Sequence, residues 1–228
     1  MLGGQGVMIN WSDVAPEHRA AYYEWHSREH MVGRVGIAGF QRGRRYLAVN
    51  AQRDFLVLYE VDDLSVLTGA DYLAKANAPS ALTQRTTPFV KNSVRGISRV
   101  IKSLGIGTGG YALTLRFDPA GGAADKLSRH LCDDAFPPLA AIPEIVGVHL
   151  LVADKSASTM VPVERKGRPT IIPNWIVVLE GISIAALDSA CDARLAGESL
   201  RAHGCARGAE RETYGLQLMV SKPRAVTA

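Results

Sequence analysis

Two histidines in the stretch EWHSREHM, from Glu24 to Met31, have the residue type and the spacing to carry out chemistry. His26 and His30 begin and end the pattern H-x-x-E-H, which one class of metalloproteases uses to bind zinc. On a helix, residues four positions apart point the same way, so both imidazoles should face one surface. The spacing therefore suggests either a zinc site or a histidine pair that transfers protons.

Two observations weigh against a zinc site. A catalytic zinc needs a third protein ligand and an open position for water, and no downstream carboxylate lies in a matching context. Cys132, Cys191 and Cys205 are scattered, without the C-x-x-C spacing of a zinc knuckle. We therefore expect no bound metal. Two alternatives remain open: a metal site completed by an unknown carboxylate, and two half-buried histidines with a purely structural role.

The helix expected to carry this stretch has an unusually polar face. It presents Tyr22, His26, His30 and then Arg34, where an amphipathic helix normally turns apolar residues toward its sheet. Buried polar groups are costly unless they have partners, so a small cavity between helix and sheet would explain the pattern. An imidazole with a pKa near 6.5 takes either form at neutral pH. Such a cavity is therefore suited to proton transfer.

The composition is that of a globular protein. The chain has 228 residues, of which 47% are hydrophobic and 21% charged, so it can bury a full core. The odd number of scattered cysteines favours a reducing compartment. No leader-like start is present, nor an apolar run of roughly 20 residues that could cross a bilayer. We therefore expect a cytoplasmic protein without a membrane partner.

The net charge of +4 is concentrated in one half of the sequence. Residues 1–105 contain 13 Lys and Arg against 9 Asp and Glu, whereas the remainder contains 13 of each. The most basic segment contains Arg42, Arg44, Arg45 and Arg53. It is explained either by a charged strand edge that resists aggregation or by an arginine that holds an anionic or phenolate ligand. Nucleic acid is not expected as a partner, because no stacking aromatics alternate with these arginines.

An internal repeat organises the sequence. Strand-like, helix-like and strand-like segments recur in the same order after a shift of 105 positions, and the next strand recurs after a shift of 120. The 15 additional residues fall within 154–173, a polar, proline-containing segment that predicts an inserted loop. The expected strands and helices are 6–11, 16–30, 37–49, 55–61, 63–76 and 93–102 in the first half, and 111–116, 123–133, 142–154, 175–181, 184–196 and 213–222 in the second.

These elements predict an α+β fold of two tandem ferredoxin-like β-α-β-β-α-β repeats. The repeats cover residues 1–104 and 111–228, and a glycine-rich linker occupies 105–110. Strands such as 55–61 and 175–181 are apolar on both faces, so both faces must be covered. Helices cover only one face of such a sheet. We therefore expect the two antiparallel sheets to pack face to face as a dimeric α+β barrel within one chain, in a monomeric pseudodimer or a homodimer.

The order of motifs within residues 20–100 resembles the EthD-like branch of the dimeric α+β barrel superfamily. The matching motifs are YYEWHSREHM, IAGF, RGRRY, FLVLYEV and ADYL. The second half matches only in architecture and in the turn IPEI. The superfamily includes isomerases, polyketide cyclases, cofactor-free quinone-forming monooxygenases and several haem proteins. The fold alone therefore does not select a reaction.

The resemblance assigns the acid–base role to His30, which matches the histidine of that family. His26 would orient or assist it, since the family often has tyrosine at this position. Arg34 would hold a developing oxyanion, although the resemblance also agrees with a structural arginine. The candidate substrate-binding residues are aromatic side chains that would form the cavity walls, although core packing would also explain them: Tyr22, Trp25, Tyr46 and Tyr59.

Three functions agree with these residues. The first is a cofactor-independent isomerase, lyase or cyclase that uses histidine acid–base chemistry on a hydrophobic, aromatic or polyketide-like small molecule. The second is a haem-binding or haem-degrading monooxygenase-type protein with a histidine as iron ligand. The third is a non-catalytic carrier of a small ligand.

The second half should lack this chemistry. After the 105-residue shift, the three polar positions of the helix fall on Leu131, Ala135 and Leu139, which are apolar. His130 and His149 do not recreate the helical pair, because neither aligns with a histidine of the first half. We therefore expect one working pocket per chain, in the first half.

Overall fold

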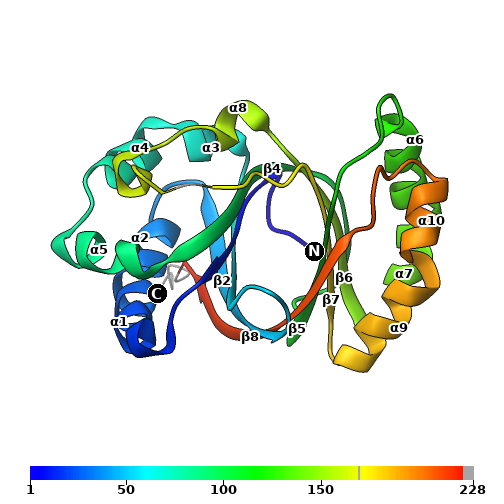
Figure 1. The fold of residues 1–228 in the computed structure, drawn as a ribbon, viewed down its shortest axis with the longest axis horizontal. Helices are drawn as coiled ribbons and strands as arrows, with labels where there is room; N and C mark the ends of the chain where they lie inside the picture. Colours follow the sequence, from blue (N-terminus) through cyan, green and yellow to red (C-terminus); the bar gives the residue numbers. More distant parts are fainter. Residues whose placement is uncertain (169, 223–228) are drawn as a thin grey trace, which may run out of the picture.

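The computed structural model describes residues 1–168 and 170–222. Eight strands form one closed antiparallel barrel in the order β1-β3-β2-β8-β5-β7-β6-β4 (Figure 1). The strands are β1 (Gly6–Asp13), β2 (Phe40–Asn50), β3 (Phe55–Val61), β4 (Lys91–Gly105), β5 (Tyr111–Phe117), β6 (Ile145–Ala153), β7 (Trp175–Gly181) and β8 (Glu210–Ser221).

The expectation of two ferredoxin-like repeats whose separate sheets pack face to face is wrong. Strand β2 pairs with β8, with Arg44 opposite Met219, and β4 pairs with β6, with Ser103 opposite His149. These two seams join the halves edge to edge, so the eight strands form a single closed barrel. Closure satisfies the backbone groups of every strand edge, which two stacked open sheets would leave unpaired.

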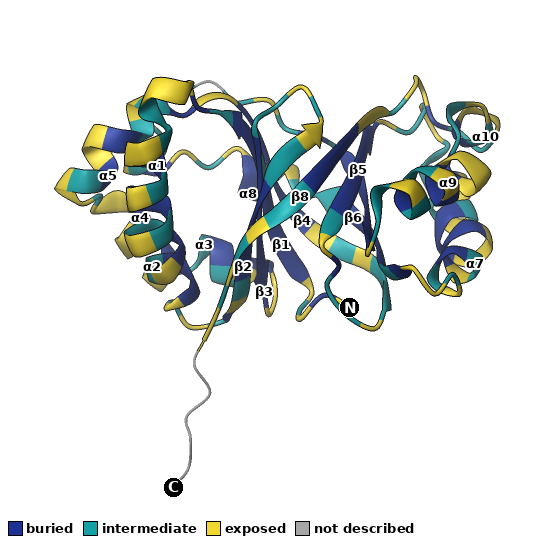
Figure 2. Cartoon of the chain, turned by 90° about the horizontal axis from the view of Figure 1, so that it is seen from below, coloured by how far each residue is buried: buried dark blue, intermediate teal, exposed yellow. Residues whose placement is uncertain are grey.

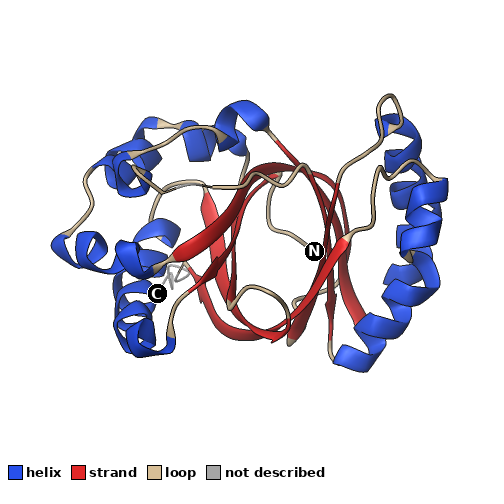
Figure 3. Ribbon diagram, viewed as in Figure 1, coloured by secondary structure: helices blue, strands red, loops and turns tan. Residues whose placement is uncertain are grey.

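Helices cover two opposite sides of the barrel, one group from each half of the chain (Figure 3). None of the helices in the described residues is long and apolar enough to cross a membrane. The first group comprises η1 (Pro16–His18), α1 (Arg19–Trp25), η2 (His26–His30), α2 (Met31–Val35), α3 (Leu64–Thr68), α4 (Ala70–Asn77), α5 (Ala81–Thr86) and η3 (Thr87–Phe89). The second group comprises α6 (Ala124–Arg129), η4 (His130–Ala135), α7 (Phe136–Ala140), α9 (Ile184–Arg194) and α10 (Gly197–Ala202). Two further short helices, α8 (Lys155–Ser158) and η5 (Val163–Arg165), follow β6 and precede β7 in the sequence.

Successive side chains along each strand point in turn into the barrel and toward its outer surface. In β2, Arg44 contacts Tyr46 and Glu180 inside the barrel, whereas Arg45 contacts the helix that carries the histidines. Strands β3 and β7 are buried along their whole length, and Figure 2 shows much of the barrel wall in the dark colour of buried residues. Their inward side chains pack in the barrel and their outward side chains pack under helices, which confirms that both faces are covered.

A π-helical turn interrupts the first long helix at the two histidines. Pro16 begins the helical segment, and its fixed φ suits a first turn. After the helix, Gly39 adopts a φ of +82° against Val66, where a Cβ would lie 2.4 Å from a methyl group. A second π turn, η4, occurs in the other half. The π turn is therefore part of both halves and does not by itself identify a functional site.

The segment predicted as an inserted loop crosses to the first half of the chain. Figure 1 shows α8, in the yellow-green part of residues 154–173, beside α3, and η5 of the same segment contacts α4. Ile171 forms a parallel bridge with Val94 of β4. The N–H of Val163 donates to Oδ1 of Asn77 at 3.0 Å. A segment from the second half therefore covers the helical side of the first half.

Candidate functional site

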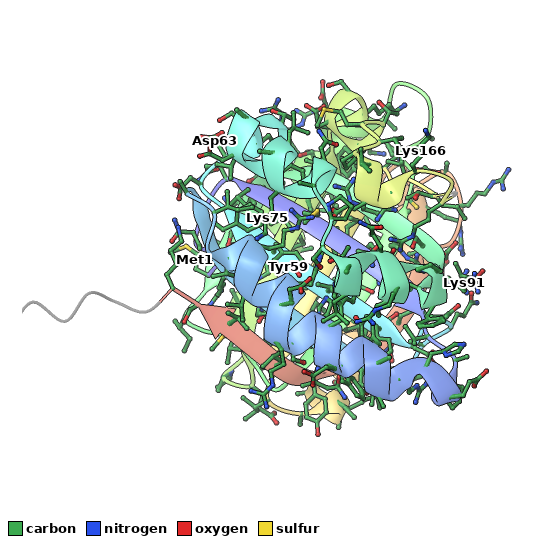
Figure 4. All side chains as sticks on the ribbon, turned by 90° about the vertical axis from the view of Figure 1, so that its left-hand side faces the viewer. Met1, Tyr59, Asp63, Lys75, Lys91 and Lys166 are labelled. Carbon is green, nitrogen blue, oxygen red and sulfur yellow. The ribbon has the colours of Figure 1, made fainter. Side chains whose placement is uncertain are left out.

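A cavity of about 70 Å³ lies between the π-containing helix and the outer surface of β1, β3 and β4. Figure 4 looks onto this side of the molecule, with Tyr59 near the centre of the view. The cavity is lined by residues from the strands, the helices and the inserted segment: Met8, Asn10, Ser12, Tyr22, Trp25, His26, His30, Arg34, Val57, Tyr59, Tyr72, Thr87, Val90, Arg95, Glu164, Arg165 and Arg168.

The structure brings six of the seven sequence-predicted site residues to this cavity, and Tyr46 is the exception. Tyr46 lies inside the barrel, where its hydroxyl accepts a hydrogen bond from Nη1 of Arg44 at 2.8 Å. The arginine-rich strand is not a solvated edge either, since Arg44 is fully buried and Arg45 is 5% exposed. One residue along β2 decides which side of the barrel wall each side chain faces.

The two histidines stack against each other and against aromatic neighbours. The ring centroids of His26 and His30 lie 5.5 Å apart at an interplanar angle of 28°. Tyr22 stacks on His26 at 5.0 Å, and Trp25 lies 4.4 Å from His30. Nε1 of Trp25 donates to Oγ1 of Thr83 at 2.9 Å, which fixes the indole. Both imidazoles are therefore held in place within an aromatic stack.

Burial keeps both histidines neutral. Burial first, and the nearby charge of Arg45 second, hold the pKa of His26 well below its usual value of 6.5. For His30, burial comes first and the charge of Arg34 second, and its pKa is also well below 6.5. A neutral imidazole has one nitrogen free to accept a proton. A ring of this pair can therefore act as a base where its accepting nitrogen is free.

Arg45 defines the tautomer of His26. Nη1 of Arg45 lies 3.3 Å from Nδ1 of His26 and donates to Oγ of Ser27 at 3.1 Å. Because a guanidinium group only donates, Nδ1 must be the acceptor, so Nε2 carries the hydrogen. His26 thus has its accepting nitrogen already occupied. This leaves His30 as the better candidate for the working base, with His26 as a positioning residue.

The glutamate of the H-x-x-E-H pattern has partners of its own. Oε1 of Glu29 accepts hydrogen bonds from Oγ of Ser80 at 2.5 Å and from Oγ1 of Thr83 at 3.0 Å. These bonds tie the π turn to the start of α5. Within residues 1–168 and 170–222, no three side chains of His, Cys, Asp or Glu converge as metal ligands. The absence of metal stays a prediction.

Four charged residues of the cavity escaped the sequence analysis: Arg95, Glu164, Arg165 and Arg168. Glu164 forms an ion pair with Arg34, whose guanidinium also lies 4.9 Å above the ring of Tyr72. The available signal was the charged run ERKGR inside a segment that has no counterpart in the first half. The extra length of the second half indicated an insertion, but no sequence pattern indicated which half of the chain the inserted segment covers.

The corresponding surface of the second half is filled. Leu131, Ala135 and Leu139 are 0–2% exposed and belong to one apolar core with Phe136. His130 lies away from that core, and its ring stacks on His203 at 3.4 Å. The polar helix face of the first half thus has an apolar counterpart.

The cavity opens toward a larger groove. This groove has a volume of about 1190 Å³ and shares Thr87, Val90, Glu164 and Arg168 with the cavity lining. A further pocket of about 200 Å³ adjoins His30 on the other side. A ligand much larger than the cavity could therefore reach the histidines from the groove.

Solved structures match the fold along nearly the whole chain. An anthrone oxidase-like protein is 14% identical, with a TM-score of 0.66, and the match covers 95% of this chain and 92% of that one. A proposed monooxygenase from Fusobacterium nucleatum subsp. nucleatum is 8% identical, with a TM-score of 0.64 and coverage of 97% and 96%. A mutant chlorite dismutase from Candidatus Nitrospira defluvii is 9% identical, with a TM-score of 0.56 and coverage of 93% and 90%. No protein-family model and no curated protein sequence matches the chain.

These matches define the class of fold: the chain is a dimeric α+β barrel. At such low identity they establish the fold alone, and they do not distinguish an EthD-like branch. The names of these similar proteins include monooxygenases and a chlorite dismutase, and a further match is a haem-binding protein from Thermus thermophilus.

Haem, which the name of one similar structure mentions, does not fit the histidine cavity. Pockets for small molecules and cofactors measure roughly 300–1,000 Å³, against about 70 Å³ here. Nδ1 of His26 faces Arg45, so this ring is not presented as a free axial ligand. No catalytic step is assigned to haem.

Proposed function

We propose that the histidine cavity is the active site of a cofactor-independent monooxygenase. A neutral histidine removes a proton from an activated C–H or phenolic O–H group of an aromatic small molecule, and the resulting anion reacts with O2. The stacked pair of neutral imidazoles, His26 and His30, beside arginine cations is the observation that carries this proposal. The EthD-like order of motifs and the similar anthrone oxidase-like and monooxygenase structures support the same assignment.

Residue roles follow from the contacts in the cavity. His30 is the base, because its nitrogens have no partner among the described residues that would occupy the accepting position. His26 is held by Arg45 and positions the ring of His30 by stacking. Nη1 of Arg34 has no hydrogen-bond partner in the described part of the chain, and it is placed to stabilise the negative charge that deprotonation creates.

The reaction balances without a cofactor. For a substrate with an acidic CH2 group, His30 accepts one proton and leaves a carbanion. The carbanion transfers one electron to O2, and recombination forms a C–O bond and a peroxide anion. This anion takes the proton back from the imidazolium. Loss of water from the hydroperoxide leaves a carbonyl, so one O2 is consumed and one water is released per CH2 converted to C=O.

Anthrone and its hydroxylated derivatives are the test substrates, because their central CH2 group is acidic and its oxidation gives a quinone. The purified protein should consume O2 and form the quinone in a ratio of one to one, measured with an oxygen electrode and by absorbance. His30→Asn should lower the rate by about 100-fold or more, the size of a general-base contribution. The rate should be unchanged by a chelator.

Three other outcomes would each replace the proposal. Turnover without O2 uptake would indicate the isomerase, lyase or cyclase. A Soret band in the purified protein would indicate haem. Binding of the anthrones without turnover, with equal affinity in His30→Asn, would indicate a carrier.

A further inference from the structure

The cavity carries more positive charge than its described lining neutralises. Four arginines line it, Arg34, Arg95, Arg165 and Arg168, and Glu164 is the one carboxylate among the described lining residues. Glu164 forms an ion pair with Arg34. The remaining three guanidinium groups form no ion pair with a described residue. With four arginines and one glutamate, the described lining therefore carries a net charge of +3.

The hydrogen bonds of these three arginines do not neutralise the excess positive charge of the cavity. Their partners within residues 1–168 and 170–222 are all neutral: Oη of Tyr72 and Sδ of Met8 for Arg95, Oγ1 of Thr170 for Arg165, and Oγ of Ser93 for Arg168. Burial first, and then the charges of Arg95 and Arg168, lower the pKa of Arg165 to about 9. A buried charge without a counter-charge is costly. Arg95 is 3% exposed, and Arg165 and Arg168 are half-buried beside it, so an anion in the cavity would stabilise this arrangement.

Unpartnered polar atoms point to the missing group. Four buried atoms of the cavity lining have no hydrogen-bond partner in the described residues: Nη1 of Arg34, Nε of Arg168, Oη of Tyr59 and Oδ1 of Asn10. Three of these four atoms can donate. Arg34 and Tyr59 are each only 3% exposed, so bulk water does not satisfy them. An acceptor that carries negative charge would satisfy the three donors.

We propose that this cavity binds the anionic oxygen group, a carboxylate or a phosphate, of an aromatic or otherwise apolar ligand. Arg165 and Arg168 of the inserted segment are its specificity-determining residues. A guanidinium fork matches both anions in geometry. The statement that this ligand is the substrate of the monooxygenase rests on the proposed function. The anion site itself stands on the charges and contacts of the cavity alone.

The outer groove accommodates the rest of such a ligand. The cavity, at about 70 Å³, holds a head group and not a whole molecule, whereas the groove measures about 1190 Å³. Apolar side chains interrupt the polar lining of the groove: Ala78, Pro79, Pro88, Val90, Val163 and Ile171. An acid head in the cavity and an apolar body in the groove place the atoms next to the head beside His30.

A bound anion would also strengthen the base. After burial, the positive charges of Arg34, Arg168 and Arg165 contribute to the low pKa of His30. An anion among these arginines offsets their field and raises the pKa of His30, so the base becomes strong only when its substrate is present. The other titratable groups on the cavity and on the adjoining pocket of His30 are Tyr22, His26, Glu29, Tyr59, Tyr72, Lys75, Arg95 and Glu164.

The test titrates the whole protein with benzoate or inorganic phosphate by calorimetry, at constant ionic strength kept with chloride. Saturable binding is expected, and Arg165→Gln and Arg168→Gln should each weaken it by about tenfold or more. Lys155→Gln is the matched control, because it removes one positive charge from an exposed position of the same inserted segment. Arg165→Lys, which keeps the charge, should retain part of the affinity. By NMR, the pKa of His30 should rise when the anion is added.

Tighter binding of benzoate than of phosphate would assign a carboxylate, and the reverse would assign a phosphate. Equal affinity in the parent and in both arginine variants, or no saturable binding, would overturn the anion site. His30→Asn should retain anion binding and lose oxygen uptake. Anion binding in a parent protein that consumes no O2 would contradict only the proposed monooxygenase activity. Oxygen uptake without anion binding would contradict only the anion site.

Discussion

Nη1 of Arg44 donates to Oε2 of Glu180 at 2.6 Å inside the barrel, although the two residues lie 136 positions apart. Nη2 of Arg44 lies 2.8 Å from Oε1 of Glu60. His149 lies with its Nε2 3.2 Å from Oε1 of Glu180. All four residues are 0–1% exposed. One buried network thus links strands β2 and β3 of the first half to β6 and β7 of the second.

Removing one member of this network should destabilise the whole barrel. Glu180→Ala should lower the free energy of unfolding by about 3–5 kcal/mol, because it leaves buried charge without its partner. Arg99→Gln is the control, since it breaks an ion pair whose arginine is 64% exposed, and such pairs contribute at most about 1 kcal/mol. Urea unfolding measures both. Similar losses from the two variants would show that the network adds no stability.

The carboxylate of Glu180 should also make the stability of the protein depend on pH in the acid range. Burial opposes the ionisation of Glu180, but the hydrogen bond with His149 and the charge of Arg44 outweigh it and lower its pKa from 4.5 to about 2. A lowered carboxylate pKa means that its stabilisation is complete above pH 4.5 and is lost as the pH falls through about 2. Glu180→Gln should flatten the decline of the unfolding free energy in this pH range. An unchanged decline would contradict the assignment.

The buried histidines should weaken the fold already at mild acidity. Burial, and then Arg45, lowers the pKa of His26, and burial lowers the pKa of His149 despite its contact with Glu180. Below pH 6.5 the unfolded chain therefore binds protons that the native protein does not bind. The free energy of unfolding thus decreases as the pH is lowered. Each such group contributes a slope of at most about 1.4 kcal/mol per pH unit. Unfolding free energies from pH 7.5 to 5 should show this slope, reduced in His26→Asn.

The two halves should not fold separately. A fragment of residues 1–108 leaves the outer edges of β2 and β4 unpaired, and a fragment of residues 109–228 does the same for β6 and β8. Neither fragment should give a cooperative melt, whereas mixing the two should restore the spectrum of the full chain. Circular dichroism and size-exclusion chromatography test this. A stable monomeric half would instead support the division into independent domains at residues 104 and 111.

The site should be asymmetric, with one working pocket per chain. His30→Asn should abolish oxygen uptake with little loss of stability, because a polar residue remains in a polar cavity. His130→Asn is the matched control in the other π turn, and its activity should stay within a few-fold of the parent. Equal losses in the two variants, or two benzoate molecules bound per chain, would place the chemistry elsewhere.

Local pattern predicted the eight strands and most of the candidate site, whereas α5 and α10 were not predicted. Alternation and continuous apolar runs predicted the strands, because side chains leave a strand with a period of two. The spacing of Tyr22, His26, His30 and Arg34 placed them on one helix face, since that face depends only on the turn of the helix. The apolar residues at the matching positions of the second half predicted a filled core there for the same local reason.

Only the tertiary structure decided how the strands close and what completes the cavity. The seams that join β2 to β8 and β4 to β6 depend on edges far apart in sequence, and the alternation is the same whether an edge pairs or packs face to face. Tyr46 and Tyr59 looked equivalent in sequence, but the barrel wall separates them. Arg165 and Arg168 reach the first-half histidines because the inserted segment folds across the barrel, a choice made by long-range contacts that no local pattern encodes.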